Sequence, residues 1–159
     1  GNPYKGREAA EESREDLKQI LQDSKIVFLT TGLGGGTGTG ATPVVAQIAK
    51  ELGALTIAVV TRPFYFEGRN RTINANAGIT ELTKYVDSIV VVDNDKLLKS
   101  LGQNISVLNA FNEANAVLYN AVRGISDAIT GAGFINLDLA DVDIIMRSCL
   151  NWSWPWSWC

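Results

Sequence analysis

A glycine-rich segment, GLGGGTGTG at residues 32–40, limits the folds open to this chain more than any other stretch of the sequence. The preceding residues 26–30, IVFLT, form a continuous apolar run that is typical of a strand covered on both faces of a parallel sheet. Residues 41–52 are expected to form a helix that tolerates Pro43 in its first turn, and residues 55–60, LTIAVV, a second buried strand. The order of strand, helix and strand predicts a βαβ unit with a parallel sheet.

Further helical patterns surround this unit. Residues 7–22 and 71–85 are expected to be helices, and residues 88–92 a third strand. Steps of three and four predict a long helix with one buried stripe, made of Leu108, Phe111, Asn115, Leu118, Val122, Ile125 and Ile129. Asn115 is the only polar member of that stripe, so its amide needs a hydrogen-bond partner. The predicted fold class is α/β: a Rossmann-like three-layer parallel sheet that ends in a long central helix.

The composition excludes several classes of protein. Of the 159 residues, 46% are hydrophobic and 19% are charged, which is typical of a globular domain. The net charge of −3 provides no positive field for nucleic acid, and no apolar run approaches the ~20 residues needed to cross a bilayer, so we expect neither a nucleic-acid partner nor direct membrane insertion. Both cysteines lie in the last eleven residues, which indicates no disulfide framework and favours a cytoplasmic location.

The glycine-rich segment itself indicates an anion site. Backbone N–H groups and the start of the following helix attract a phosphate, and glycines let its oxygens come close, while Thr37 and Thr39 add hydroxyl donors. The segment lacks the Gly-Lys-Ser/Thr of a Walker A loop and meets the dinucleotide fingerprint only in its G-x-G-x-x-A form. A glycine-rich turn without a ligand is the alternative, although six glycines lose more backbone entropy than a simple turn requires.

Four motifs in one order resemble those of a known family. They are GGGTGTG at residues 34–40, TRPFYFEGRNR at residues 61–71, NDKLL at residues 94–98 and NLDLAD at residues 136–141. Over residues 1–146 the chain resembles the FtsZ/tubulin family of self-assembling GTPases, and it is more similar to the bacterial FtsZ branch of cell division than to eukaryotic tubulin. The resemblance implies a protein at the division site that binds GTP or GDP with Mg²⁺, assembles head to tail with copies of itself and meets other division proteins.

The resemblance also implies roles for single residues. The phosphates would be held by Gly34, Gly35, Gly36, Thr37, Gly38, Thr39 and Gly40. Glu67 and Arg71 would contact the sugar and phosphate side of the nucleotide. Asn94 and Asn115 would bond the guanine edge, with Phe111 stacking near it. Taken alone, Glu67 and Arg71 are interpreted as a solvated i, i+4 ion pair, and Asn94 as a turn residue or helix cap.

Two carboxylates three positions apart, Asp138 and Asp141, open a short predicted helix that reaches about Met146. Capping of this helix by Asp138 would explain them without any chemistry. The resemblance implies instead that this loop enters the nucleotide site of the next subunit, where both carboxylates polarise the attacking water and Asn136 orients the loop. Positioning and electrostatics supply most of the catalysis of phosphoryl transfer, so a chain without histidine can be a GTPase.

Both ends of the chain depart from the family. Residues 1–3 resemble the middle of the family's nucleotide domain, so we expect residues 1–146 to be a partial GTPase domain without the second, β-rich domain. Residues 147–159 contain all four tryptophans and resemble nothing in the family. We interpret them as an unrelated tail produced by a frameshift, with a membrane-interface segment as the alternative.

Three functional hypotheses remain open at the level of sequence. The first is the nucleotide-binding, polymer-forming core of a division GTPase. The second is a fragment that no longer binds nucleotide and acts only as an interaction module. The third, a Rossmann-type oxidoreductase, is disfavoured because the dinucleotide fingerprint is incomplete.

Overall fold

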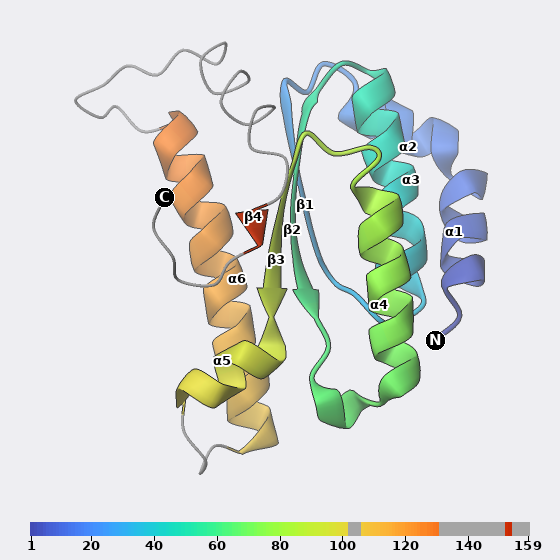
Figure 1. Cartoon of the computed structure of the whole chain (residues 1–159). Helices are drawn as coiled ribbons and strands as arrows, with labels where there is room; N and C mark the ends of the chain where they lie inside the picture. The colour runs from blue at the N-terminus through green and yellow to red at the C-terminus, as the bar shows by residue number, and fades with distance from the viewer. Residues whose placement is uncertain (102–105, 131–151, 154–159) are drawn as a thin grey trace.

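The computed structural model describes residues 1–101, 106–130 and 152–153 (Figure 1). Its centre is a parallel sheet in the order β1-β2-β3-β4. The strands are β1 (Ile26–Gly32), β2 (Leu55–Arg62), β3 (Ser88–Asp93) and β4 (Trp152–Ser153). The predicted α/β class is confirmed, because all three predicted strands form and pair in parallel.

Helices cover both faces of the sheet (Figure 1). Figure 1 places α5 and α6 on one side and α3 and α4 on the other, with α1 and α2 as an outer layer against α3. The helices are α1 (Pro3–Glu12), α2 (Arg14–Leu21), α3 (Thr37–Glu51), the 3₁₀ turn η1 (Tyr65–Glu67), α4 (Arg69–Leu82), α5 (Asn94–Leu101) and α6 (Val107–Thr130). None of the helices in the described ranges is both long and apolar enough to span a membrane.

The short strand β4 is not predicted by the sequence. Trp152 and Ser153 pair in parallel with Val90 and Val91 of β3 and so extend the sheet by one short ladder. The remainder of the tail lies outside the described residues, as does the predicted helix near Met146. The division into a partial domain and an unrelated tail therefore stays a prediction.

The core lies around β2, the strand between β1 and β3. Ile57, Ala58, Val59 and Val60 are fully buried, because helices cover both faces of this strand. Alternation along the strand places Ala58 and Val60 in one apolar cluster and Ile57 in another, which Ile125 of α6 joins. Each fully buried Val or Ile side chain contributes about 1.5–3 kcal/mol. β2 therefore anchors the sheet at whose end the candidate site lies.

The N-terminal helix differs from its prediction. The pattern predicts one helix over residues 7–22, whereas the structure has two helices with Ser13 between them. α1 begins early because Pro3 suits the first helical position and Asn2 accepts a hydrogen bond from the Tyr4 N–H at 3.0 Å. The break lets both helices pack on α3, in a cluster of Ala10, Leu17, Leu21, Val44 and Ile48.

α3 begins at Thr37 and not at Ala41 as predicted. The second half of the glycine-rich segment is thus the first turn of a helix, and Pro43 lies inside that helix, beyond its first turn. Contact with α1 explains a glycine here, because a Cβ atom at Gly40 would collide with the carbonyl oxygen of Pro3. The absence of a side chain lets the backbones of α1 and α3 touch where they cross.

α6 exposes much of the stripe that the sequence predicts to be buried. Leu108 is 71% exposed and Phe111 38%, and Asn115 is exposed as well. The buried residues of this part of the helix are Ala110 and Ala114, at 1% and 4%. Their small side chains bring the helix close to its neighbours, which turns the larger residues toward the margin of the contact. The prediction of one buried stripe is therefore wrong for the first half of the helix.

An ion pair between α2 and α3 makes a pH-dependent contribution to stability. Arg14 donates to Glu51 at 2.7 Å, and this hydrogen bond holds the pKa of the Glu51 carboxyl below its ordinary value of 4.5. With a lowered folded-state pKa, the contribution is present above pH 4.5 and is lost as the pH falls through the pKa of the folded chain.

We expect Glu51→Gln to lower the free energy of unfolding at neutral pH by only about 0.5 kcal/mol, since both side chains of the pair are partly exposed. Urea unfolding of both proteins across the acid range measures the effect. The difference between them should vanish at low pH, and a difference that is independent of pH would contradict the assignment.

Candidate functional site

The predicted site residues follow the carboxyl ends of three neighbouring strands. The glycine-rich segment comes after β1, Glu67 after β2 and Asn94 directly after β3, and these ends meet at the lower edge of the sheet in Figure 1. Ligands of open parallel α/β sheets bind outside this edge. The structure therefore brings segments that are 27 residues or more apart in the sequence to one common edge.

An internal hydrogen bond fixes the first part of the glycine-rich segment. Gly34 has a φ of +107°, and its N–H donates to the Thr39 hydroxyl at 2.8 Å. A Cβ atom on Gly34 would lie 2.9 Å from the carbonyl oxygen of Arg71, so the segment also rests against the start of α4. Thr39 is only 5% exposed. The N–H of Gly34 is thus satisfied inside the segment, and Thr37 carries the exposed hydroxyl.

The next part of the segment is open. A Cβ atom on Gly35 would meet nothing within 4 Å, and the N–H groups of the first turn of α3 receive no side-chain cap. Beside it, a groove of about 600 Å³ runs between α1 and the start of α3, and Lys5, Gly36 and Thr37 are among the residues that line it. Free N–H groups, an exposed hydroxyl and a cation are suited to an anion. No pattern in the sequence points to Lys5, because α1 reaches this place only by tertiary packing.

Glu67 and Arg71 are bound to each other. One oxygen of the Glu67 carboxylate accepts a hydrogen bond from the Arg71 guanidinium at 2.7 Å, and the other oxygen accepts one from the Phe64 N–H at 2.9 Å. The side chain of Glu67 is 13% exposed and that of Arg71 53%. The i, i+4 ion pair that the residues alone suggest is therefore formed, between η1 and α4. Contact of either residue with a nucleotide stays a prediction.

Asn94 carries an unpartnered polar atom. It is the first residue of α5 and 4% exposed, and its side-chain Oδ1 is buried without a hydrogen-bond partner. Among the residues that the structure describes, no other buried side-chain nitrogen or oxygen is in this state. A buried acceptor left unpaired costs about 1–3 kcal/mol, so it is expected to be retained for a ligand. Asn94 does not cap α5 through its own side chain, because Asp93 accepts the N–H groups of that turn.

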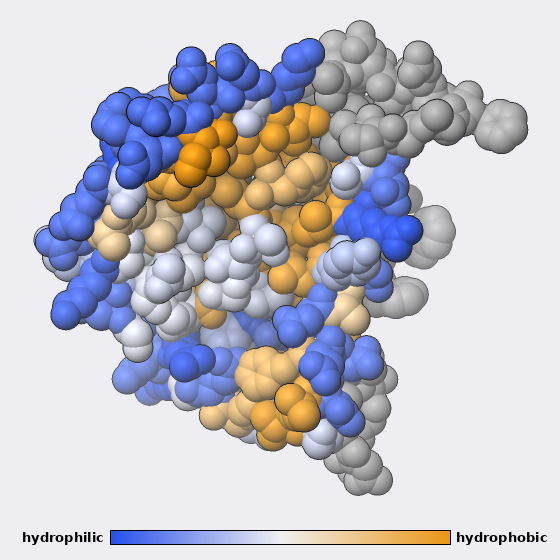
Figure 2. Space-filling view, turned by 180° about the vertical axis from the view of Figure 1, so that it is seen from behind, coloured by the Kyte–Doolittle hydropathy of each residue, from blue (hydrophilic) through white to orange (hydrophobic). Residues whose placement is uncertain are grey.

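An aromatic cluster of Phe64, Phe66 and Phe111 lies at the same edge. Phe64 stacks on Phe66 with ring centroids 4.9 Å apart, and the rings of Phe64 and Phe111 are nearly perpendicular with centroids 5.0 Å apart. Phe64 is 1% exposed, whereas Phe66 and Phe111 keep 41% and 38%. Figure 2 shows an apolar patch at the lower end of the molecule. Sequence reasoning assigned no role to Phe64 or Phe66, although both lie in a quoted motif.

The remaining predicted residues are Asn115 on α6 and three residues that follow this helix in the sequence. Asn115 lies on α6 but is exposed, unlike Asn94. The predicted catalytic residues Asn136, Asp138 and Asp141 lie outside the described residues. Within residues 1–101 and 106–130, no three acidic or thiol side chains gather in a way that could hold a metal ion.

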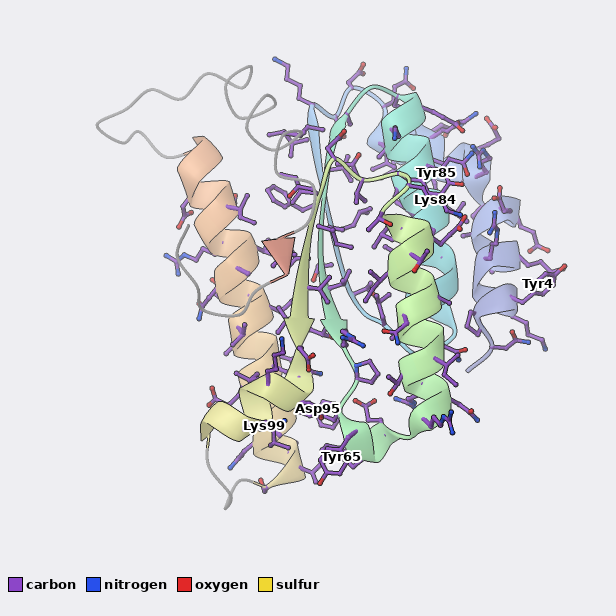
Figure 3. All side chains as sticks on the ribbon, in the orientation of Figure 1. Tyr4, Tyr65, Lys84, Tyr85, Asp95 and Lys99 are labelled. Carbon is purple, nitrogen blue, oxygen red and sulfur yellow. The ribbon has the colours of Figure 1, made fainter. Side chains whose placement is uncertain are left out.

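Glu81, near the end of α4, lies at the end of the molecule opposite to the candidate site. A hydrogen bond from Lys84 holds the pKa of Glu81 below its ordinary value, and the same contact raises the pKa of Lys84. Figure 3 shows Lys84 and Tyr85 at the upper end of the molecule, with Tyr65 and Asp95 at the lower end.

Comparison with curated sequences gives clear relatives. Two proteins named cell division protein FtsZ, from Buchnera aphidicola subsp. Baizongia pistaciae and Coxiella burnetii, are each 56% identical to this chain over 145 residues. The matched region is 91% of this chain and 38% of each relative. The chain thus spans about two fifths of the length of these relatives.

Solved structures share the fold. A structure described as an empty FtsZ dimer from M. jannaschii is 51% identical, with a TM-score of 0.89 over 92% of this chain and 43% of that one. A GTPγS-bound protofilament of CetZ2 from Haloferax volcanii is 21% identical and matches in fold alone, with a TM-score of 0.73 over 92% of this chain and 44% of that one. A family model described as Tubulin/FtsZ family, GTPase domain, matches residues 1–102. Because this match covers well over half of the chain, the chain belongs to the Tubulin/FtsZ family.

Proposed function

We propose that this chain is the nucleotide-binding core of a GTPase that assembles in bacterial cell division, and that it selects guanine nucleotides. The observation that carries the proposal is the buried, unpartnered Oδ1 of Asn94, at the same end of the sheet as the aromatic cluster. An acceptor oxygen requires an N–H donor. Guanine presents two donors at positions 1 and 2 of its base-pairing edge, N1–H and the 2-amino group, whereas adenine has an acceptor and a C–H at these positions and its donor, the 6-amino group, lies elsewhere on the edge. A buried group built for one hydrogen bond strongly rejects a ligand that lacks the partner.

The phosphates are proposed to lie over the open part of the glycine-rich segment. Gly35 leaves space there, and the first-turn N–H groups of α3 and the Thr37 hydroxyl are free to donate. The positive end of the α3 dipole and the Lys5 ammonium favour an anion at this place. The described residues offer Mg²⁺ no cluster of carboxylates, so in this proposal the ion arrives with the phosphates of the nucleotide.

The remaining contacts are proposed by family membership. Arg71, 53% exposed, extends from the Glu67 pair toward the sugar and phosphate side. Phe111 offers an exposed ring face beside which the base stacks, and Asn115 an exposed amide for the guanine edge. These positions lie on η1, α4 and α6, so the base would bind where the three elements meet.

Hydrolysis is proposed to require two copies of the chain. Asp138 and Asp141, with Asn136 orienting their loop, would enter the nucleotide site of the next subunit and polarise the attacking water. Head-to-tail assembly of copies, contact with other division proteins and a cytoplasmic place at the division site belong to the same proposal. The relative from M. jannaschii is described as a dimer, which supports self-association in the family. The competing hypothesis is a nucleotide-incompetent interaction module.

Calorimetric titration of the 159-residue chain with GTP, and with ATP as control, tests the proposal. We expect GTP to bind and ATP to bind at least tenfold more weakly, because only guanine satisfies Asn94. Failure of a folded sample to bind either nucleotide would favour the interaction module.

A substitution separates phosphate binding from folding. Thr37→Glu puts a longer, negatively charged side chain over the phosphate space, so we expect GTP binding to fall by more than tenfold. Folding should be unaffected, because Thr37 is exposed and an acidic residue in the first turn stabilises a helix. The matched control is Asn120→Glu on the exposed side of α6, which should bind GTP as the unaltered chain does. Equal affinity of both variants for GTP would contradict the placement of the phosphates.

A further inference from the structure

The junction between β3 and α5 contains no loop. Asp93 is the last residue of the strand and Asn94 the first residue of the helix. The Oδ1 atom of Asp93 accepts hydrogen bonds from the N–H groups of Asp95 at 3.1 Å and Lys96 at 3.4 Å. This is the geometry of a helix N-cap, which holds the first turn in one conformation. Because Asn94 belongs to that turn, the Asp93 carboxylate holds the backbone from which the Asn94 side chain extends.

Asp93 is itself held by a neighbouring strand. Its other carboxylate oxygen pairs with the Arg62 guanidinium at 3.7 Å, at the end of β2. Arg62 also donates to the Oδ1 atom of Asn76 on α4 at 2.7 Å. The cap is therefore connected through one arginine to a helix on the opposite face of the sheet. Such a bridge restricts rotation of the Asp93 side chain, which would otherwise have other staggered positions open to it.

Asp95, on the other side of Asn94, also accepts a hydrogen bond. Asp95 accepts the backbone N–H of Tyr65 at 2.8 Å, and Figure 3 shows the two residues close together at the end of the sheet. This bond ties η1 to α5. The turn η1 carries Phe66, which stacks on Phe64 at the aromatic cluster. The carboxylates of both neighbours of Asn94 thus accept hydrogen bonds from backbone N–H groups.

We infer that Asp93 and Asp95 are positioning residues that hold the Oδ1 atom of Asn94 for recognition of the base, so that they determine nucleotide specificity without touching the nucleotide. The inference rests on the proposed function and names the part of the chain on which its selectivity depends. A hydrogen bond rejects the wrong base only when its acceptor has a fixed position, because a mobile amide adjusts to either ligand. Asp93 has the larger effect on the position of Asn94, since it accepts hydrogen bonds from two N–H groups of the turn.

The test compares variants of Asp93 in the 159-residue chain. Asp93→Ala removes the cap, whereas Asp93→Ser retains a capping oxygen of the same preference. We expect the ratio of GDP to ADP affinity, measured by calorimetric titration, to fall about fivefold to tenfold in Asp93→Ala, through weaker GDP binding at unchanged ADP binding. Asp93→Ser should restore most of the ratio. The control is Asp127→Ala, which removes an exposed carboxylate that pairs only with Arg123 on α6 in the described structure.

Hydrogen exchange provides a readout that needs no nucleotide. The amides of Asp95 and Lys96 should exchange faster in Asp93→Ala than in the unaltered chain, and at the original rate in Asp93→Ser. An equal loss of GDP and ADP affinity in Asp93→Ala, or a failure of serine to restore selectivity, would overturn the inference while leaving nucleotide binding intact. If the unaltered chain binds no nucleotide, the proposed function is overturned and the role in base recognition with it, whatever the exchange rates report about the cap.

Discussion

Replacement of Gly40 by alanine is expected to lower the free energy of unfolding by about 3 kcal/mol. The added Cβ atom would collide with the carbonyl oxygen of Pro3 and lie 2.7 Å from the backbone nitrogen of Arg7. Both atoms belong to the backbone of α1, so no side-chain rotation relieves the overlap, and α1 must move away from α3. Alanine raises helix propensity by about 1 kcal/mol over glycine, which is too little to offset this loss. Urea unfolding followed by circular dichroism measures the change.

Two other glycines are matched controls for this substitution. A Cβ atom meets nothing within 4 Å at Gly35, in the same segment, or at Gly124, on α6. Gly35→Ala should therefore fold with nearly unchanged stability, and Gly124→Ala should be stabilised by up to about 1 kcal/mol. Equal stability of Gly40→Ala and Gly35→Ala would contradict the close crossing of α1 over α3. Since Gly35 borders the proposed phosphate space, Gly35→Ala should also bind GTP more weakly although it folds.

Asn94→Leu is expected to make the empty chain more stable and to remove its preference for guanine. Leucine has a similar size and carries no polar atom, so the cost of the buried, unpartnered Oδ1 disappears and stability should rise by about 1–2 kcal/mol. Binding of GDP should weaken by at least tenfold, because the guanine edge then loses its acceptor. Urea unfolding measures the first effect, and titration with GDP and ADP the second. A substitution that raises the stability of the free chain but weakens ligand binding identifies a residue that is retained for the ligand.

The matched control for Asn94→Leu is Asn120→Leu. Asn120 is exposed on α6, where its amide is solvated, so the substitution should leave both stability and GDP affinity nearly unchanged. A loss of stability in Asn94→Leu would show that Oδ1 has a partner within the protein. Unchanged GDP affinity would remove Asn94 from the site.

The strands and the edge that carries the site are predictable from sequence, because their signals are local. A short, continuous apolar run such as residues 26–30 is stable only when both faces are covered, which requires a parallel sheet with helices on either side. The glycine-rich segment and Asn94 follow such runs directly. Residues that follow parallel strands meet at one edge of the sheet, so the sequence predicts a common site for them.

The roles of individual atoms depend on segments far apart in the chain. The close crossing of α1 and α3 requires a residue without a side chain at Gly40. The packing of α6 likewise determines that Ala110 is buried while Phe111 stays partly exposed. The N–H of Gly34 donates to Thr39 because the backbone turns there with a positive φ. No pattern of residues predicts this hydrogen bond.

The local pattern of residues therefore determined the α/β class and the parallel strands, and it predicted the positions from which a ligand would be held. Tertiary packing alone decided that the Oδ1 atom of Asn94 is buried without a partner, and that Asp93, joined to Arg62, caps the turn on which it sits. The physical reason is that secondary structure responds to the periodicity of neighbouring side chains, whereas burial and hydrogen-bond partnership are properties of the space between elements.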